Sequence, residues 1–166
     1  MPSEISLRPA TQADLPFLER LYRSVRWDEF APTGWPEAAK VAFLASQFDY
    51  QQRHHAAAFP DADARVVEHQ GAPIGQLVVD RTTPRLHLVD ISLLPEWRGN
   101  GVGGALIGAL QDEVRAGRAE AVSLNVDRTN PGAQRLYQRL GFVETPPATP
   151  YPGLSIEMYW PPEAVS

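Results

Sequence analysis

The chain has 166 residues, of which 43% are hydrophobic, and a formal net charge of −5. This length and composition suit one compact domain over residues 1–166 with a sizeable core. The acidic balance, without a cluster of Lys or Arg, argues against a nucleic-acid partner. The absence of cysteine excludes disulfides, thiolate metal sites and a cysteine nucleophile. With neither a signal-peptide pattern nor an apolar stretch of roughly 18 residues, we expect a cytoplasmic protein that does not bind a membrane.

The first third of the chain predicts one strand and two helices. Residues 5–8 alternate as a short strand does. Thr11 and Asp14 have the spacing of a capping box, and an apolar helical period follows them as far as about residue 26. Proline and glycine within residues 27–35 predict a loop, or a loop with a short turn, before a second helix over residues 36–58.

Three successive strands are predicted over residues 64–69, 74–80 and 86–93, and the short turns between them indicate an antiparallel meander. The hydrophobic period then becomes helical over residues 101–117.

The last part of the chain predicts a strand over residues 121–126 and a helix over residues 131–140 that ends at Gly141. Two further strands are expected over residues 142–144 and 155–160. The order of elements predicts an α/β fold, with a mixed, mostly antiparallel sheet of about seven strands flanked by about four helices.

A glycine-rich turn joins the third strand of the meander to the following helix. Such a turn presents several backbone N–H groups at a helix N-terminus, which is a site for a phosphate or pyrophosphate. Gly99, Gly101 and Gly104 match the spacing of the dinucleotide fingerprint, but they follow an antiparallel meander, and Glu120 precedes a strand instead of ending one. The context therefore disfavours a nicotinamide cofactor, and the lack of a following Gly-Lys-Ser/Thr excludes a triphosphatase loop.

The run Arg98-Gly99-Asn100-Gly101-Val102-Gly103 resembles the Q/R-x-x-G-x-G/A signature of the GNAT N-acetyltransferases, which use acetyl-CoA. A second block resembles the same family: Asn125-Val126, followed by Asn130-Pro131-x-Ala133-x-x-Leu136-Tyr137-x-x-Leu140-Gly141-Phe142. The ordered elements from residue 5 to residue 160 also fit the family's topology. The resemblance therefore implies the acyl-CoA N-acyltransferase (GNAT) fold and acetyl-CoA as cosubstrate.

In this family the strand before the loop splays from its neighbour, usually at a bulge, and its free backbone groups bind the pantetheine arm. The loop wraps the pyrophosphate at the helix N-terminus. The resemblance places the following residues at the cofactor: Ile91, Ser92, Leu93, Arg98, Gly99, Asn100, Gly101, Val102, Gly103, Asn130 and Tyr137. Asn130 is equally an ordinary N-cap for the helix that begins at Pro131.

The implied chemistry requires a neutral amine, a stabilised oxyanion and a proton for the leaving thiolate. The resemblance implies Tyr137 as the general acid and a main-chain N–H around Leu93 for the oxyanion. The surrounding block favours this acid role over the alternative, in which Tyr137 is a core residue with its hydroxyl satisfied. Direct transfer is expected, because the chain has no cysteine to carry an acyl group.

Asp90 interrupts an apolar strand, so it needs a partner or a shifted pKa. It either relays a proton from the amine or bonds a neighbouring backbone group. His87 is a weaker candidate for the base, because strand alternation puts it on the opposite face from Asp90.

The acceptor pocket is expected between residues 27–35, the second helix and residues 146–153. Asp28 and Glu29 could attract a cationic amine, on a small molecule or a peptide.

We expect no metal, because the adjacent His54 and His55 point about 100° apart on a helix. A non-catalytic acyl-CoA-binding sensor or interaction module on the same scaffold is the alternative function. The last predicted strand, residues 155–160, could pair or exchange between two subunits, so a homodimer remains an open alternative.

Overall fold

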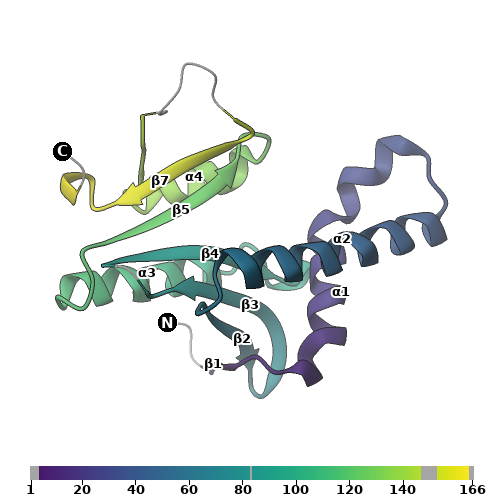
Figure 1. Ribbon diagram of the computed structural model, residues 1–166, viewed down its shortest axis with the longest axis horizontal. Helices are drawn as coiled ribbons and strands as arrows, with labels where there is room; N and C mark the ends of the chain where they lie inside the picture. The colour runs from purple at the N-terminus through teal and green to yellow at the C-terminus, as the bar shows by residue number, and fades with distance from the viewer. Residues whose placement is uncertain (1–3, 83, 147–152, 165–166) are drawn as a thin grey trace.

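The computed structural model describes residues 4–82, 84–146 and 153–164, and these form a mixed sheet of seven strands (Figure 1). Every neighbouring pair of strands is antiparallel except β4 and β5, which are parallel. In spatial order the strands are β1 (Ile5–Pro9), β2 (Asp63–His69), β3 (Ala72–Asp80), β4 (Arg85–Leu93), β5 (Ala121–Asp127), β7 (Ser155–Trp160) and β6 (Val143–Glu144). The predicted α/β sheet is confirmed.

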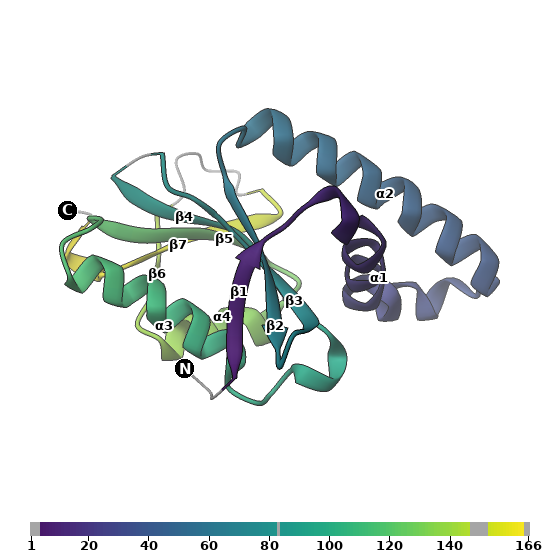
Figure 2. The same cartoon turned by 90° about the horizontal axis from the view of Figure 1, so that it is seen from below.

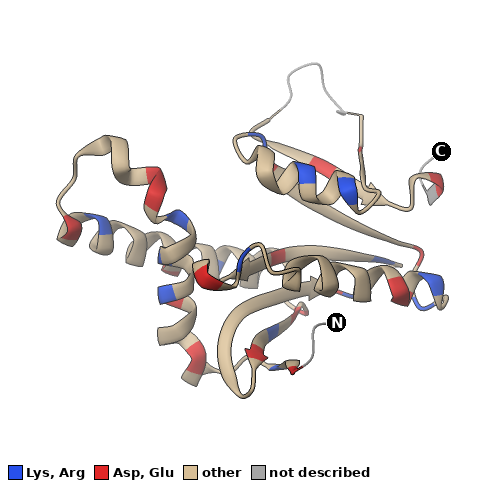
Figure 3. Cartoon of the chain, turned by 180° about the vertical axis from the view of Figure 1, so that it is seen from behind, with Lys and Arg blue, Asp and Glu red and all other residues tan. Residues whose placement is uncertain are grey.

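Four α-helices cover the two faces of the sheet: α1 (Leu15–Arg26), α2 (Glu37–Ala58), α3 (Val102–Arg115) and α4 (Pro131–Arg139). Figure 2 shows α1 and α2 on one face, with α3 and α4 on the other. The larger core lies between the sheet and α3–α4, and a smaller cluster lies under α1. Seen from behind in Figure 3, acidic and basic residues are spread over most elements. No helix in the described part of the chain is long and apolar enough to cross a membrane.

The predicted capping box begins the first helical segment, a 3₁₀ turn (Gln12–Asp14) that leads into α1. The Thr11 N–H donates to the Asp14 carboxylate at 2.8 Å. Arg8 on β1 binds the same carboxylate at 2.7 Å and also Glu68 on β2 at 2.9 Å, and it holds the pKa of Asp14 well below its usual range. This network fixes the direction in which α1 leaves the sheet.

The segment predicted as a loop before α2 is instead a 3₁₀ helix (Trp27–Thr33) that Gly34 ends at φ +69°. The reason is tertiary packing, because Phe30 is buried against the rings of Trp35 and Phe43 at 5.6 and 5.5 Å. A proline within the segment is compatible with this geometry, since its φ suits a helical turn. The aromatic cluster orders the connection between α1 and α2.

Strand β7 lies inside the sheet, because it pairs with β5 on one side and with β6 on the other. All six of its residues pair with β5, whereas on the other edge Met158 and Tyr159 alone pair with β6 among the described residues. The edge strands of the described sheet are β1 and β6.

Candidate active site

Strands β4 and β5 pair along four residues and then diverge. Residues 85–88 of β4 pair with residues 121–124 of β5, and beyond that point β4 pairs with β3 alone and β5 with β7 alone. Figure 1 shows β5 rising away from β4. Among the described residues, Ile91, Ser92 and Leu93 thus have no strand partner on the β5 side. The expected splay is present at the expected residues.

A β-bulge precedes the splayed part of β4, because β4 has one more residue than β3 between two successive pairs, and Val89 is the extra one. The bulge shifts the alternation of side chains. His87 stacks on Phe59, beyond the end of α2, with ring centroids 5.5 Å apart, while Asp90 faces α1 and α2. The expectation that His87 and Asp90 point to opposite faces is therefore wrong.

Gly75 on β3 supports the splayed strand, and the sequence reading did not single it out. A Cβ at this position would overlap the Ser92 carbonyl oxygen and lie 2.7 Å from Leu93 Cδ2. Only glycine lets the two backbones approach this closely. A glycine within an otherwise apolar strand was the signal that could have identified the position.

The glycine-rich loop ends in an open helix N-terminus. Gly99 and Gly101 have φ of +76° and +81°, which glycine adopts at little cost. Gly101 is the N-cap of α3 and has no side chain to accept the first helical N–H groups. A Cβ at Gly99, Gly101 or Gly104 would meet no atom within 4 Å apart from those of its chain neighbours and of the adjoining helix backbone. The donors of this helix end are therefore accessible to an anion.

Two polar side chains fix the shape of this loop. Arg98 Nε donates to the Leu93 carbonyl oxygen at 3.1 Å, which ties the loop to the end of β4. Asn100 Nδ2 donates to the Glu96 carbonyl oxygen at 3.3 Å. Trp97, in a short 3₁₀ turn (Pro95–Trp97), contacts His69 in a tilted arrangement with ring centroids 4.6 Å apart, and it packs against the core.

Helix α4 brings two predicted residues to the β5 side of the gap. The Asn130 side chain accepts the Ala133 N–H at 3.1 Å, which confirms its N-cap role. Tyr137 lies seven residues further, on the same side of the helix, and is buried against Phe142. Burial and the negative charge of Asp90 raise the pKa of Tyr137 to about 12. The phenol stays protonated at neutral pH, and no described residue is its hydrogen-bond partner.

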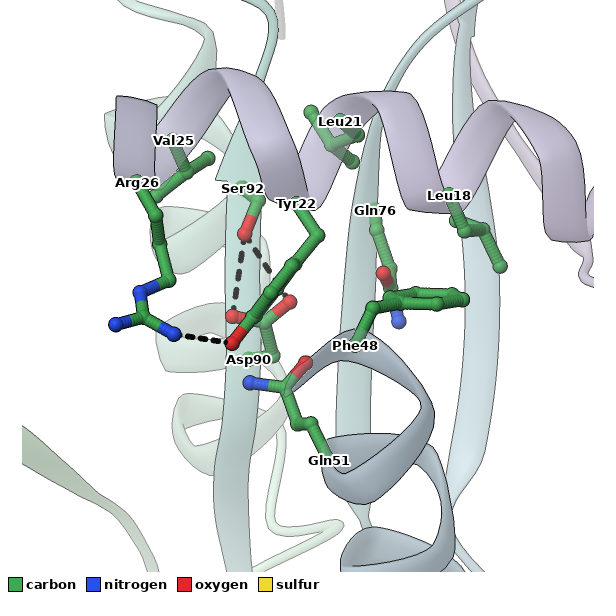
Figure 4. Close-up of a pocket in the computed structure, with 10 residues that line it drawn as sticks. All are labelled: Leu18, Leu21, Tyr22, Val25, Arg26, Phe48, Gln51, Gln76, Asp90 and Ser92. Carbon is green, nitrogen blue, oxygen red and sulfur yellow. Dashed lines mark hydrogen bonds between the residues drawn. The ribbon is translucent and has the colours of Figure 1, made fainter. Parts of the chain in front are cut away.

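Asp90 lies partly buried beside α1 and α2 (Figure 4). The Ser92 hydroxyl donates to its carboxylate oxygens at 3.2 and 3.1 Å, and the Ile91 N–H also favours the ionised form. Burial nevertheless raises the pKa of Asp90 to about 6, because desolvation outweighs these bonds. This carboxylate is ionised at neutral pH and basic enough to accept a proton.

A cavity of about 120 Å³ opens beside Asp90 between α1, α2, β3 and β4. Its walls are Leu18, Leu21, Tyr22, Val25, Arg26, Phe48, Gln51, Gln76, Asp90 and Ser92. Helix α2 contributes Phe48 and Gln51 to these walls, whereas residues 27–35 do not line this cavity. Glu29 forms an ion pair with Arg26 at 2.8 Å, and Asp28 is exposed. Most of the expected 146–153 segment lies outside the described residues.

The histidines do not form a metal site. His54 and His55 have ring centroids 6.0 Å apart, and His55 packs on Phe59. His87 hydrogen-bonds to the Ser123 hydroxyl at 2.9 Å, and burial lowers its pKa. Within the described ranges no three His, Asp or Glu residues gather closely enough to hold a metal ion.

Several solved structures with a similar fold are described as acetyltransferases. The PaiA N-acetyltransferase of Thermoplasma acidophilum, solved with coenzyme A, has a TM-score of 0.67 and 17% identity over 93% of this chain and 97% of that one. Spermidine N-acetyltransferase of Vibrio cholerae, solved with CoA and spermine, has a TM-score of 0.63 and 23% identity over 95% of each chain. A Corynebacterium glutamicum protein described as 'histone acetyltransferase HPA2 and related acetyltransferase' has a TM-score of 0.62 and 25% identity, over 96% of this chain and 97% of that one.

These likenesses define the fold as that of the GNAT acetyltransferases. The model of the acetyltransferase (GNAT) family matches residues 19–142, which is most of the chain, so this protein belongs to that family. A comparison with curated protein sequences gives no significant match.

Proposed function

We propose that the protein is an acetyl-CoA-dependent N-acetyltransferase that moves an acetyl group directly to a primary amine. One observation carries the proposal. The unpaired edge of β4 leads into an uncapped helix N-terminus, and a protonated phenol and a basic carboxylate lie beside that same edge. CoA bound to the PaiA and spermidine enzymes supports the choice of cosubstrate.

The proposed cofactor site runs from the splay to the loop. The backbone of Ile91–Leu93 pairs with the pantetheine arm as a further strand would. Residues 98–103 hold the pyrophosphate, with the guanidinium of Arg98 pairing with a phosphate while its Nε stays on the Leu93 carbonyl. Asn130 keeps its oxygen on the helix and offers its amide N–H groups to the pantetheine.

The proposed reaction uses three groups of the chain. Asp90 takes a proton from the ammonium form of the acceptor, so that the nitrogen can attack the thioester carbonyl. The Leu93 N–H stabilises the oxyanion. It points towards the gap, because the next N–H, that of Leu94, donates to Ile74 on β3 at 2.8 Å. As the C–S bond breaks, Tyr137 gives its phenolic proton to the thiolate. The nitrogen loses its second proton on becoming an amide, and this proton returns to the Tyr137 phenolate through solvent, while Asp90 releases its own proton to water.

A titration of the purified protein with acetyl-CoA, with CoA and NADH as comparators, tests the cofactor assignment. We expect binding of both CoA forms and none of NADH. A thiol-release assay with a panel of amines then separates the enzyme from a non-catalytic acyl-CoA sensor. Turnover of an amine that falls sharply in Tyr137→Phe supports the enzyme, whereas tight CoA binding with no turnover supports the sensor.

A further inference from the structure

We propose that the cavity beside Asp90 binds the acceptor, and that the acceptor is a small α-amino acid with an apolar side chain. Its amino group lies at Asp90 and its carboxylate at Arg26. This inference rests on the proposed function and adds the chemical class of the substrate.

The two charged side chains that line the cavity have opposite signs. Asp90 extends from β4, and Arg26 from the last turn of α1. Arg26 pairs with Glu29 and not with Asp90, so the positive and negative groups occupy separate parts of the wall. Figure 4 shows the Arg26 guanidinium hydrogen-bonded to the Tyr22 hydroxyl, and both residues line the cavity together with Asp90. A zwitterion complements this distribution of charge better than a simple cation does.

Arg26 is held in place and retains donors for a ligand. Its Nε donates to Glu29 at 2.8 Å and its Nη1 to the Tyr22 hydroxyl at 2.6 Å. Its guanidinium also lies over the rings of Tyr22 and Phe30, at 5.5 and 5.7 Å from their centroids. The described residues accept from two of its five N–H donors, so the rest can bind a carboxylate. Because Glu29 is 60% exposed, water can solvate it when a second carboxylate approaches the guanidinium.

The remaining walls select the size and side chain of the acceptor. Leu18, Leu21, Val25 and Phe48 give the cavity an apolar side, which suits an aliphatic group. At about 120 Å³ the cavity is well below the roughly 300–1,000 Å³ of typical ligand pockets, so it suits a single small molecule. A diamine bound at Asp90 would place its second ammonium group near the Arg26 guanidinium, and the two positive charges would repel each other.

The test compares acceptors that differ in the carboxylate alone. Thiol release from acetyl-CoA is measured with L-valine, L-valinamide and isobutylamine, and with the matching alanine series. We expect kcat/KM for the amino acid to exceed that for its amide by at least about tenfold. The amide has the less basic amine, so this preference does not arise from an easier deprotonation.

Variants locate the origin of the preference. Arg26→Gln should remove the preference for the carboxylate and leave acetyl-CoA affinity and the melting temperature near those of the wild type. Arg23→Gln, on the same helix but lining a different hollow with Trp27 and Glu37, should leave the preference intact. Equal rates for acids, amides and amines, with no effect of Arg26→Gln, would overturn this inference and leave the proposed function standing.

A binding measurement covers the case in which no amine is acetylated. Calorimetric titration of L-valine into the CoA-loaded protein should show binding that Arg26→Gln abolishes and Arg23→Gln retains. That result would support the amino-acid site even if the proposed catalysis failed. No binding of any of these amino acids would overturn the site.

Discussion

Tyr137 and Asp90 come from opposite sides of the sheet, yet the negative charge of Asp90 contributes to the raised pKa of the Tyr137 phenol. Tyr137 approaches the gap from α4, and Asp90 approaches it from β4 beside the bulge. The divergence of β4 and β5 makes this approach through the sheet feasible. A proton donor and a proton acceptor therefore lie beside the same unpaired strand edge.

Tyr137→Phe should lower kcat by about 10²–10³ and leave the dissociation constant for acetyl-CoA nearly unchanged, because it removes the proton donor and keeps the ring. Steady-state rates and calorimetry measure the two quantities. Tyr159→Phe is a matched control, since Tyr159 is equally buried, at 7% exposure, but lies on β7. Equal losses in both variants would indicate a packing effect and contradict the acid role.

Asp90→Asn should remove the acidic limb of the pH–rate profile. In the wild type kcat should rise as pH increases through about 6, where Asp90 loses its proton, and the variant should show a low rate without this rise. An unchanged profile would make Asp90 a structural residue.

Asp90→Asn should lower the rate but raise the stability of the fold. The pKa of Asp90 is higher in the folded state than in the unfolded state, so the folded chain binds more protons between about pH 4 and 6, and the free energy of unfolding falls as pH rises through this range. Asp90→Asn avoids burying that charge and should be more stable than the wild type at pH 7 by about 1–3 kcal/mol. Denaturant unfolding at pH 4 and pH 7 measures this, and the gain should be much smaller at pH 4.

Gly103→Glu should weaken acetyl-CoA binding by at least about tenfold, because it places a carboxylate at the helix end proposed to hold the pyrophosphate. Gly103 is a better choice than Gly101, whose φ of +81° would add backbone strain. Gly103→Gln separates the effect of charge from that of bulk. Gly108→Glu places the same side chain further along α3, where a Cβ would meet no atom within 4 Å outside its own stretch of helix. An affinity that Gly103→Glu leaves intact would contradict the loop assignment.

Gly75→Ala should destabilise the fold by about 1–3 kcal/mol and also weaken acetyl-CoA binding, since the new Cβ displaces the backbone at Ser92 and Leu93. Chemical denaturation and calorimetry measure the two effects. Gly108→Ala is the control, because it has free space within a helix and should be neutral or stabilising by up to about 1 kcal/mol. Full CoA affinity in Gly75→Ala would show that Gly75 does not position the strand edge.

Local signals in the sequence were enough to predict most of the elements. The helical period of α3, the Asn130 cap and the end of α4 at Gly141 each depend on neighbours within a few residues. The loop glycines were found for the same reason.

The features that escaped prediction depend on contacts between distant segments. Val89 becomes a bulge only through the register of β4 against β3, and this register decides which way Asp90 points. Phe30 orders a 3₁₀ helix through rings on another element. Arg26 reaches the cavity because α1 and α2 cross one face of the sheet together.

The short pairing of β4 with β5 has a mechanical consequence. Four residue pairs join the half of the sheet made by β1–β4 to the half made by β5, β7 and β6. Beyond Leu88 and Leu124 the two strands β4 and β5 no longer pair with each other. A molecule that forms hydrogen bonds with both unpaired strand edges would add connections between the two halves. The two halves of the sheet would then move less relative to each other when the gap is filled than when it is empty.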